Sequence, residues 1–286
     1  MFASVNGIKL FFDVEGLQYV PDGPRMREKP VCFVLHGGPG GDHCNFLPET
    51  SVLAETMQLI YVDDRNCGRS ERCDISTSSL KQNAADLEAL RQYLGLDKIY
   101  ILGHSYGGMK AQQYMIDYPE HLHGVILAGT AGESGLFQTA EAIVMERGTE
   151  AQKALWKRRM NEFVPYEEFI IGMGSMYHYH YDEVEARNGT LRCIKNSEVR
   201  DYQAPEMREL DLISHLHDVK FPVLILCGKY DHITAPIYSE HLHEAIPNSE
   251  LHIIDECAHE MFSDRPDFVF PCIVDFVGRT FSSEAE

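Results

Sequence analysis

The stretch Lys98–Gly108, KIYILGHSYGG, decides how the rest of this sequence is interpreted. It begins with a short apolar run and reaches Gly103–Gly107, GHSYG, after which residues 108–118 have a helical pattern. A strand, a sharp turn and a helix with serine at the apex form the G-x-S-x-G nucleophile elbow, whose glycines make room for a strained central residue. The alternative is a glycine-rich turn with an incidental serine. The elbow interpretation predicts that Ser105 stands above the carboxyl edge of a β-sheet.

The composition is that of an ordinary globular protein with an excess of acidic residues. A chain of 286 residues, 44% hydrophobic and 24% charged, fits one large α/β domain or one domain with an insertion. The net charge of −19 argues against nucleic acid and against an anionic membrane surface as partners. No apolar run approaches the ~18 residues of a membrane-spanning helix, and MFASVNGIKL lacks the features of a secretory signal. A cytoplasmic location is therefore expected.

Cysteines and histidines, which often bind metals, show no metal-binding spacing. The eight cysteines are scattered without a C-x-x-C pair, and we expect them to be reduced thiols. The tract Tyr177–Tyr181, YHYHY, has alternate histidines, which fall on different sides of a helix. We expect no metal there, and aromatic lining of a pocket by a lid is favoured over metal binding.

Buried-strand patterns alternate with helical patterns along most of the chain. Continuous apolar runs, each typical of a strand covered on both faces, occur at residues 31–35, 58–62, 99–102, 125–128, 223–227 and 251–254. Helical periodicity occurs at residues 80–94, 109–118 and 268–277. An alternating pattern at residues 8–14 indicates an antiparallel strand. This order predicts an α/β fold with a mostly parallel, doubly wound sheet.

One segment interrupts the alternation. Residues 131–208 show helical periodicity but no buried-strand pattern, and the segment is too long for a structureless loop. We therefore expect an α/β core of residues 1–130 and 209–286, with residues 131–208 inserted as a helical cap, or lid. Its position in the chain would place it over the carboxyl edge of the sheet, above Ser105.

Two more polar residues follow predicted strands, at the edge where open α/β sheets bind their ligands. Asp231 comes after the strand at 223–227, and His259 after the strand at 251–254. Taken alone, Asp231 could be a helix cap or a turn residue, and His259 could be a surface histidine. The chain order Ser, Asp, His is that of α/β-hydrolases and predicts a catalytic triad. In it, Ser105 is the nucleophile, His259 the general base, and Asp231 orients the imidazole.

A glycine-rich loop supplies the other part of such a site. The sequence His36–Gly40, HGGPG, directly follows the strand at 31–35, and its backbone amides can approach a ligand closely. Neither G-x-G-x-x-G nor G-x-x-x-x-G-K-[ST] fits, which argues against the alternative of a phosphate-binding loop. We expect an oxyanion hole formed by the amides of Gly38 and Tyr106, the latter being the residue after the nucleophile.

Three motifs together resemble a known family. HGGPGGDH (His36–His43), DDRNCGRS (Asp63–Ser70) and GHSYGG (Gly103–Gly108) are similar to motifs of the proline iminopeptidase family of α/β-hydrolases, and GKYD and Cys257–His259 also match. The resemblance implies the α/β-hydrolase fold. It also implies an enzyme that removes an N-terminal residue, typically proline, from short peptides without a cofactor. In that family, acidic residues in or near the cap hold the free α-amine of the substrate.

The sequence indicates the substrate-binding residues less directly than it indicates the catalytic residues. Some relatives carry Glu after the catalytic Asp, where this chain has His232. Glu198 and Glu206, near the end of the cap, are the candidate acidic anchors, the alternative being solvated surface charges. Relatives with the same motifs cleave esters or lactones, so a carboxylesterase or lactonase is the alternative function. A non-catalytic ligand receptor is disfavoured because every part of the triad is present. The expected partner is a small-molecule or short-peptide substrate, and the oligomeric state is not predicted.

Overall fold

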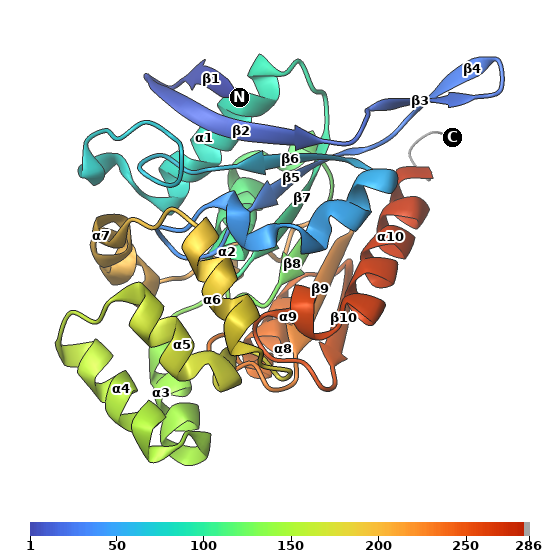
Figure 1. The fold of residues 1–286 in the computed structure, drawn as a ribbon. Helices are drawn as coiled ribbons and strands as arrows, with labels where there is room; N and C mark the ends of the chain where they lie inside the picture. Colours follow the sequence, from blue (N-terminus) through green and yellow to red (C-terminus); the bar gives the residue numbers. More distant parts are fainter. Residues whose placement is uncertain (283–286) are drawn as a thin grey trace.

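A central β-sheet organises the structure, a computed structural model that describes residues 1–282. Its eight strands have the order β1-β2-β6-β5-β7-β8-β9-β10 (Figure 1). β1 and β2 are antiparallel to their neighbours, and the strands from β5 to β10 in this sheet are parallel. The strands are β1 (Phe2–Val5), β2 (Ile8–Glu15), β5 (Val31–Leu35), β6 (Gln58–Val62), β7 (Ile99–His104), β8 (Leu122–Ala128), β9 (Val223–Gly228) and β10 (Ser249–Ile254). β3 (Tyr19–Asp22) and β4 (Arg25–Glu28) form a separate hairpin. The predicted mostly parallel α/β sheet is confirmed.

Helices cover both faces of the sheet because its central strands alternate between two apolar clusters. In β5, Phe33 packs on one face with apolar residues of α1, α2 and α8, and Val34 packs on the other with residues of α9 and α10. These helices are α1 (Leu80–Tyr93), α2 (Tyr106–Asp117), α8 (Pro236–Ala245), α9 (Met261–Asp264) and α10 (Pro266–Ser282). Short 3-10 helices occur at His43–Phe46, Glu49–Glu55, Ile75–Thr77, Pro119–His121 and Ile213–His215. Burial on both faces explains the continuous apolar runs of β5, β7 and β9.

The strand order changes direction between β5 and β7, and this defines a binding position. The chain passes from β5 to β6 on one side and then returns to β7 on the other. Open α/β sheets bind ligands at such a point, outside the carboxyl ends of the strands. Here the loops after β5 and β7 lie against each other, so that a Cβ added to Gly37 would lie 3.1 Å from the Cβ of Ser105.

Five helices are inserted between β8 and β9. They are α3 (Leu136–Arg147), α4 (Glu150–Asn161), α5 (Tyr166–Tyr177), α6 (Glu183–Arg192) and α7 (Ser197–Arg208), and they group together at the end of the molecule away from β1 (Figure 1). α3, α4 and α5 share a small apolar core that includes Val144, Trp156 and Met173. The insertion therefore has packing of its own in addition to its contacts with the sheet edge.

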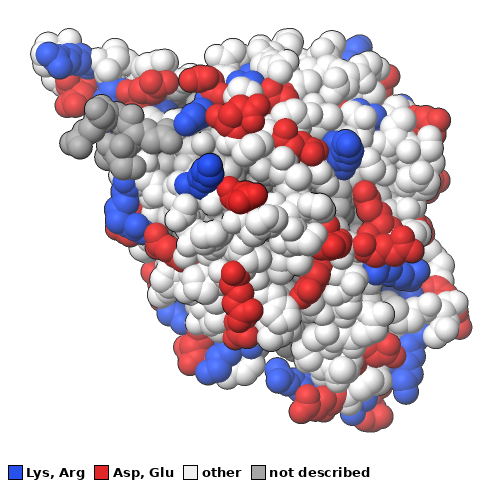
Figure 2. Space-filling view, turned by 180° about the vertical axis from the view of Figure 1, so that it is seen from behind, with Lys and Arg blue, Asp and Glu red and all other residues white. Residues whose placement is uncertain are grey.

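The surface charge, the length of the apolar helices and the state of the cysteines are relevant to the predicted partners and location. Acidic and basic side chains are interspersed over the face shown in Figure 2. Within residues 1–282, no helix is both long and apolar enough to cross a membrane. The eight cysteines all lie in this part of the chain, and none of them forms a disulfide.

Candidate active site

Ser105 occupies the sharp turn between β7 and α2, as the elbow motif predicts. Its φ of 56° and ψ of −122° are strained for a residue other than glycine, at a cost of about 1–3 kcal/mol. Neighbouring elements hold it there: its amide donates to Ala128 O at 2.9 Å, and its carbonyl accepts from Thr130 Oγ1 at 2.8 Å. A side chain at Gly103 or Gly107 would collide with nearby backbone atoms, which explains why the motif requires glycine at both positions.

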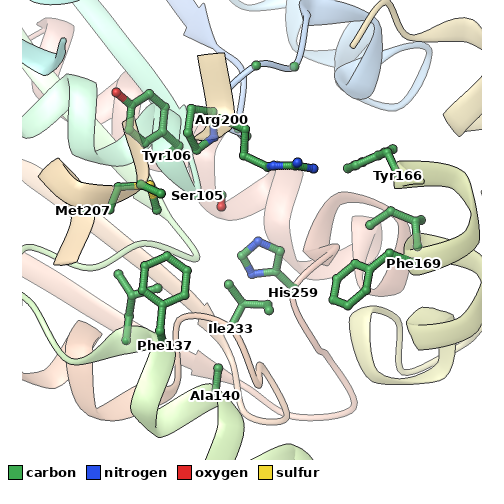
Figure 3. A pocket seen from close by; sticks show the side chains of 18 of the residues that line it. Ser105, Tyr106, Phe137, Ala140, Tyr166, Phe169, Arg200, Met207, Ile233 and His259 are labelled. Atoms are coloured by element: carbon green, nitrogen blue, oxygen red, sulfur yellow. The ribbon is translucent and has the colours of Figure 1, made fainter. Parts of the chain in front are cut away.

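His259 and Asp231 form a buried hydrogen-bonded pair at the ends of β10 and β9. The distance from His259 Nδ1 to Asp231 Oδ2 is 2.7 Å. The Asp231 carboxylate also accepts from the amides of Ile233 (2.8 Å) and Thr234 (2.9 Å) and from Thr234 Oγ1 (2.8 Å). Because a carboxylate only accepts, the proton of a neutral His259 ring resides on Nδ1, and Nε2 remains an acceptor. The Ser105 oxygen points toward this ring in Figure 3.

The pKa values of this pair shift in opposite directions. Burial alone would raise the pKa of Asp231, but the His259 imidazole and the hydrogen bonds from His259 and Thr234 outweigh burial and lower it. Burial alone would lower the pKa of His259, and the Asp231 carboxylate outweighs burial and raises it. Asp231 is therefore ionised at neutral pH, and His259 is a stronger base than an ordinary histidine in a buried position.

His104, the residue before Ser105, supports the His259 loop. Its Nε2 lies 3.0 Å from the His259 carbonyl oxygen, and the two imidazole rings are 4.8 Å apart. Burial and the proximity of His259 lower the pKa of His104, so it is neutral and donates from Nε2. Sequence analysis missed this role because His104 occupies a variable position of the elbow motif.

The glycine-rich loop after β5 packs against the elbow. Gly38 has a φ of +132°, and a Cβ there would lie 2.9 Å from the amide nitrogens of Gly40 and Gly41. Gly38 and Tyr106 both line the cavity that contains Ser105. Tyr106 is the first residue of α2, where backbone amides have no partner within the helix.

Buried polar residues support this loop from below. His36 Nε2 accepts from the Asp64 amide at 3.3 Å, and Lys110 Nζ lies 2.6 Å from Asp64 Oδ2. His36, Asp64 and Cys67 have donor atoms within 4.8 Å of one another, a spacing that a metal ion can use. The buried Lys110 ammonium already neutralises Asp64, so this group fits a structural ion pair better than a cation site.

A cavity of about 470 Å³ opens above Ser105 between the sheet edge and the inserted helices. One side is apolar, with Phe137, Met207 and Ile233, and Tyr166 and Phe169 lie on the other side (Figure 3). Tyr177, at the start of the YHYHY tract, also lines the cavity, and its ring lies 5.8 Å from the His259 ring. The volume is in the range of small-molecule sites.

The inserted helices are tied to both loops of the site. On the His259 side, Asp264 accepts from the amides of Tyr179 (2.9 Å), His180 (3.1 Å) and Ala258 (2.9 Å). On the other side, the Asn196 amide, just before α7, donates to Gly40 O at 2.8 Å. Movement of these helices would therefore displace the loops that surround Ser105.

The three predicted substrate-binding residues do not line this cavity. Both carboxylate oxygens of Glu206 accept from the Leu80 amide at 3.2 Å, at the start of α1. Glu198 is exposed at the start of α7 and borders a shallow surface depression. His232 is buried, and its Nδ1 donates to Met176 O at 2.9 Å. Burial lowers the pKa of His232 to about 4, so it is neutral at neutral pH. The structure does not bring these side chains together with Ser105.

Glu260 is a cavity carboxylate that sequence analysis missed. It follows His259 directly and lines the same cavity. Its carboxylate has no hydrogen-bond or ion-pair partner among residues 1–282. Burial alone would raise its pKa, but the electrostatic influence of His104 and His259, together with His178 and Lys195, outweighs burial and lowers it, so Glu260 is ionised at neutral pH. Its position beside the predicted base was the only signal in the sequence.

The family can now be stated. The model of the alpha/beta hydrolase fold matches residues 30–266, and the chain belongs to this hydrolase family. The curated proline iminopeptidase of Thermoplasma volcanium is 25% identical over 284 residues, 93% of this chain and 92% of that protein. The proline iminopeptidase of Saccharolobus solfataricus is 28% identical over 266 residues, 87% of this chain and 84% of that protein. These relatives confirm the predicted resemblance to the proline iminopeptidase family.

Solved structures show the same fold. The proline iminopeptidase of Mycobacterium smegmatis has a TM-score of 0.81 at 16% identity and covers 99% of each chain. The esterase EaEST of Exiguobacterium antarcticum has a TM-score of 0.76 at 21% identity, covering 97% of this chain and 99% of that one. The enol-lactonase of Burkholderia xenovorans has a TM-score of 0.72 at 19% identity, covering 97% and 100%. At these identities the likeness concerns the fold alone.

Proposed function

We propose that this protein is a serine hydrolase that works through an acyl-enzyme. Ser105 attacks the substrate carbonyl, His259 takes the serine proton and later returns it to the leaving group, and Asp231 holds the imidazole tautomer. The observation that carries the proposal is the 2.7 Å hydrogen bond between His259 Nδ1 and Asp231, beside a strained serine that faces the same cavity. Water then releases the acyl group by the same steps, so this mechanism requires no cofactor.

The oxyanion hole of the proposed enzyme consists of the amides of Gly38 and Tyr106. Both residues border the cavity beside Ser105, and the close approach of the two loops supports this assignment. Negative charge develops on the carbonyl oxygen during attack, and a preorganised donor is worth roughly 3–4 kcal/mol to the transition state.

The proposed substrate is a short peptide or amide from which the enzyme releases the N-terminal residue, typically proline. Relatives called proline iminopeptidase support this choice. Glu260 supports it independently, because an ionised carboxylate without a protein partner beside the catalytic base can bind the ammonium group of a substrate. We assign the role of a lid to residues 131–208, whose helices form the roof of the cavity.

A carboxylesterase or lactonase is the second candidate. The apolar side of the cavity, with Phe137, Met207 and Ile233, accommodates an uncharged acyl chain. The same triad and oxyanion hole would serve for ester cleavage, so geometry around Ser105 does not separate the two functions.

The distinguishing experiment measures turnover of prolyl and alanyl arylamides beside short acyl esters and lactones. Release of the N-terminal residue, lost in Ser105→Ala, is expected for the aminopeptidase. Ester or lactone cleavage without any release of an N-terminal residue would contradict the aminopeptidase proposal. Full activity of Ser105→Ala toward every substrate would contradict the proposed mechanism itself.

A further inference from the structure

Four cationic side chains of the inserted segment line the cavity, and the proposed reaction uses none of them. They are Arg159 of α4, Lys195 between α6 and α7, and Arg200 and Arg208 of α7. Arg208 is exposed, and its guanidinium lies 5.9 Å from the centre of the Phe137 ring. Arg200 extends into the space between Ser105 and Tyr166 (Figure 3). Positive charge in this position is unexpected for a site that binds only a substrate ammonium group.

Arg159 lacks an acidic partner. Its guanidinium lies 5.5 Å from the centre of the Phe169 ring, and no hydrogen bond or ion pair reaches it from anywhere in residues 1–282. The adjacent Arg158 differs, because it points to the surface and pairs with Glu168 at 2.5 Å. Arg159 therefore presents a half-buried cation to the cavity, and the nearby Asp201 carboxylate acts on its charge without an ion pair between them.

Arg200 brings a second guanidinium close to the first. Both residues line the same cavity. Burial lowers the pKa of Arg159, and the charge of Arg200 lowers it further. Nε and Nη2 of Arg200 bond Asp201 Oδ1 at 2.9 and 2.8 Å, so that Nη1 has no partner in the described part of the chain. Two guanidinium groups that face one cavity are stabilised when an anion lies between them.

The other acidic residues of the cavity do not supply that anion. Asp42 accepts from the Ile194 amide at 2.8 Å and lies 3.5 Å from Arg69. Glu141 is exposed on α3, and Glu260, next to His259, forms no hydrogen bond or ion pair with Arg159 or Arg200 in the described residues. Lys195 adds a further positive charge, 4.7 Å from the centre of the Tyr166 ring. The cavity thus has a negative group beside the base, and its roof has more cationic than acidic groups, since Asp201 pairs with Arg200 alone within residues 1–282.

We propose that Arg159 and Arg200 bind a carboxylate group of the substrate. The planar guanidinium fork matches a carboxylate with two parallel hydrogen bonds, which favours a carboxylate over a neutral polar group. For a peptide substrate, which rests on the proposed aminopeptidase function, this group is the free C-terminus and Glu260 binds the N-terminal amine. The preferred peptides are then zwitterions of two or three residues, consistent with a cavity of about 470 Å³.

The test compares two peptides with the same scissile bond, prolyl-alanine with a free carboxylate and its C-terminal amide. We expect kcat/KM to be roughly 10- to 100-fold higher for the free acid, mostly through KM, as is typical of hydrogen bonds to charged groups. Separate Arg159→Gln and Arg200→Gln substitutions should bring this ratio close to one. Arg158→Gln, a surface change one residue away, is the matched control and should leave the ratio unchanged.

A second substrate pair separates the carboxylate site from the peptidase function. The nitrophenyl monoester of adipic acid carries a terminal carboxylate, and nitrophenyl hexanoate has the same chain length without it. Preference for the adipate ester, without cleavage of either peptide, would retain the carboxylate site and reject the aminopeptidase. Equal rates within both pairs would overturn the carboxylate site, as would a preference that survives both arginine substitutions.

Binding can be measured without turnover. Calorimetry on Ser105→Ala, with the free acid and the amide of the same peptide, should show tighter binding of the acid, and Arg159→Gln in that background should remove the difference. Equal affinities for the two peptides would overturn the proposal even if no substrate of the enzyme were known.

Discussion

The carboxyl edge of the sheet and the inserted helices above it hold their side chains in different ways. At the sheet edge, backbone geometry does the positioning: Ser105 is fixed by a left-handed φ, and Asp231 by two backbone amides. In the inserted helices, the long side chains of Arg159 in α4 and Arg200 in α7 reach the cavity. The proposed chemistry therefore depends on strand ends, whereas the proposed substrate site depends on how a few long side chains pack.

The largest expected effect concerns the sheet edge alone. Ser105→Ala removes the nucleophile but no element that holds the inserted helices, so kcat should fall roughly 10⁴-fold or more while the fold is retained. Single-turnover kinetics with the best substrate found measures the fall in rate, and circular dichroism shows whether the fold is retained. Substantial residual turnover in Ser105→Ala would contradict the role of Ser105 as nucleophile, and the sheet edge would then not carry the chemistry as proposed.

A second core substitution tests the base through its pH dependence. Asp231→Asn should lower kcat/KM roughly 10⁴-fold, because an amide can stabilise the wrong imidazole tautomer. Burial lowers the pKa of His259 and Asp231 raises it by more, so in the native enzyme activity should rise with pH through a raised pKa. Without the carboxylate that pKa falls, and the acidic limb of the residual activity should move to lower pH. If the acidic limb of the pH profile of kcat/KM does not move, the proposed pairing of His259 with Asp231 is wrong.

The same division explains how much could be predicted from the sequence. The motif around Ser105, and the strand ends before Asp231 and His259, are local patterns whose geometry follows from short-range sterics and strand order. The parallel sheet was predictable because strands buried on both faces appear as continuous apolar runs.

The substrate-binding residues were not predictable in this way. Acidity near the end of the insertion predicts Glu198 and Glu206 as anchors, but Glu198 faces solvent and Glu206 accepts from the Leu80 amide at the start of α1. Which helical face turns inward depends on the packing of α3 to α7 on one another, and single charged residues do not reveal it. Glu260 and Arg159 line the cavity only because of how the inserted helices pack over the sheet edge, which no local sequence pattern specifies.

A third prediction addresses the side chain where the two regions meet. Glu260→Gln keeps the shape of the side chain but removes its charge, so kcat/KM for free-amine peptides should fall roughly 10- to 100-fold, mainly through KM. Esters without an amine should lose little, since no ammonium is bound. Acetylation of the prolyl substrate should have the same effect in the native enzyme. If the acetylated substrate reacts as well as the free amine, Glu260 is not an amine anchor.

The smallest effect concerns the attachment of the inserted helices to the core. Asn196 caps α7 by accepting from the Glu198 amide at 3.0 Å, and its side-chain amide also donates to Asn66 O at 2.9 Å. Thr149 caps α4 by accepting from the Gln152 amide at 3.3 Å, within the insertion only. Replacing either by alanine should lower the free energy of unfolding by about 1 kcal/mol, the usual cost of a lost cap.

Only the Asn196→Ala substitution should also change catalysis. It loosens α7 next to Gly40, whose carbonyl accepts from the Asn196 amide, and so reaches the proposed oxyanion loop. We expect kcat/KM to fall roughly twofold to tenfold, the range of one hydrogen bond of about 0.5–1.5 kcal/mol, with no change in Thr149→Ala. Chemical denaturation and steady-state kinetics on the same two variants give both quantities. Equal kinetics in the two variants would show that the sheet edge positions its loops independently of the helices above, which would make the division between the two regions sharper than proposed.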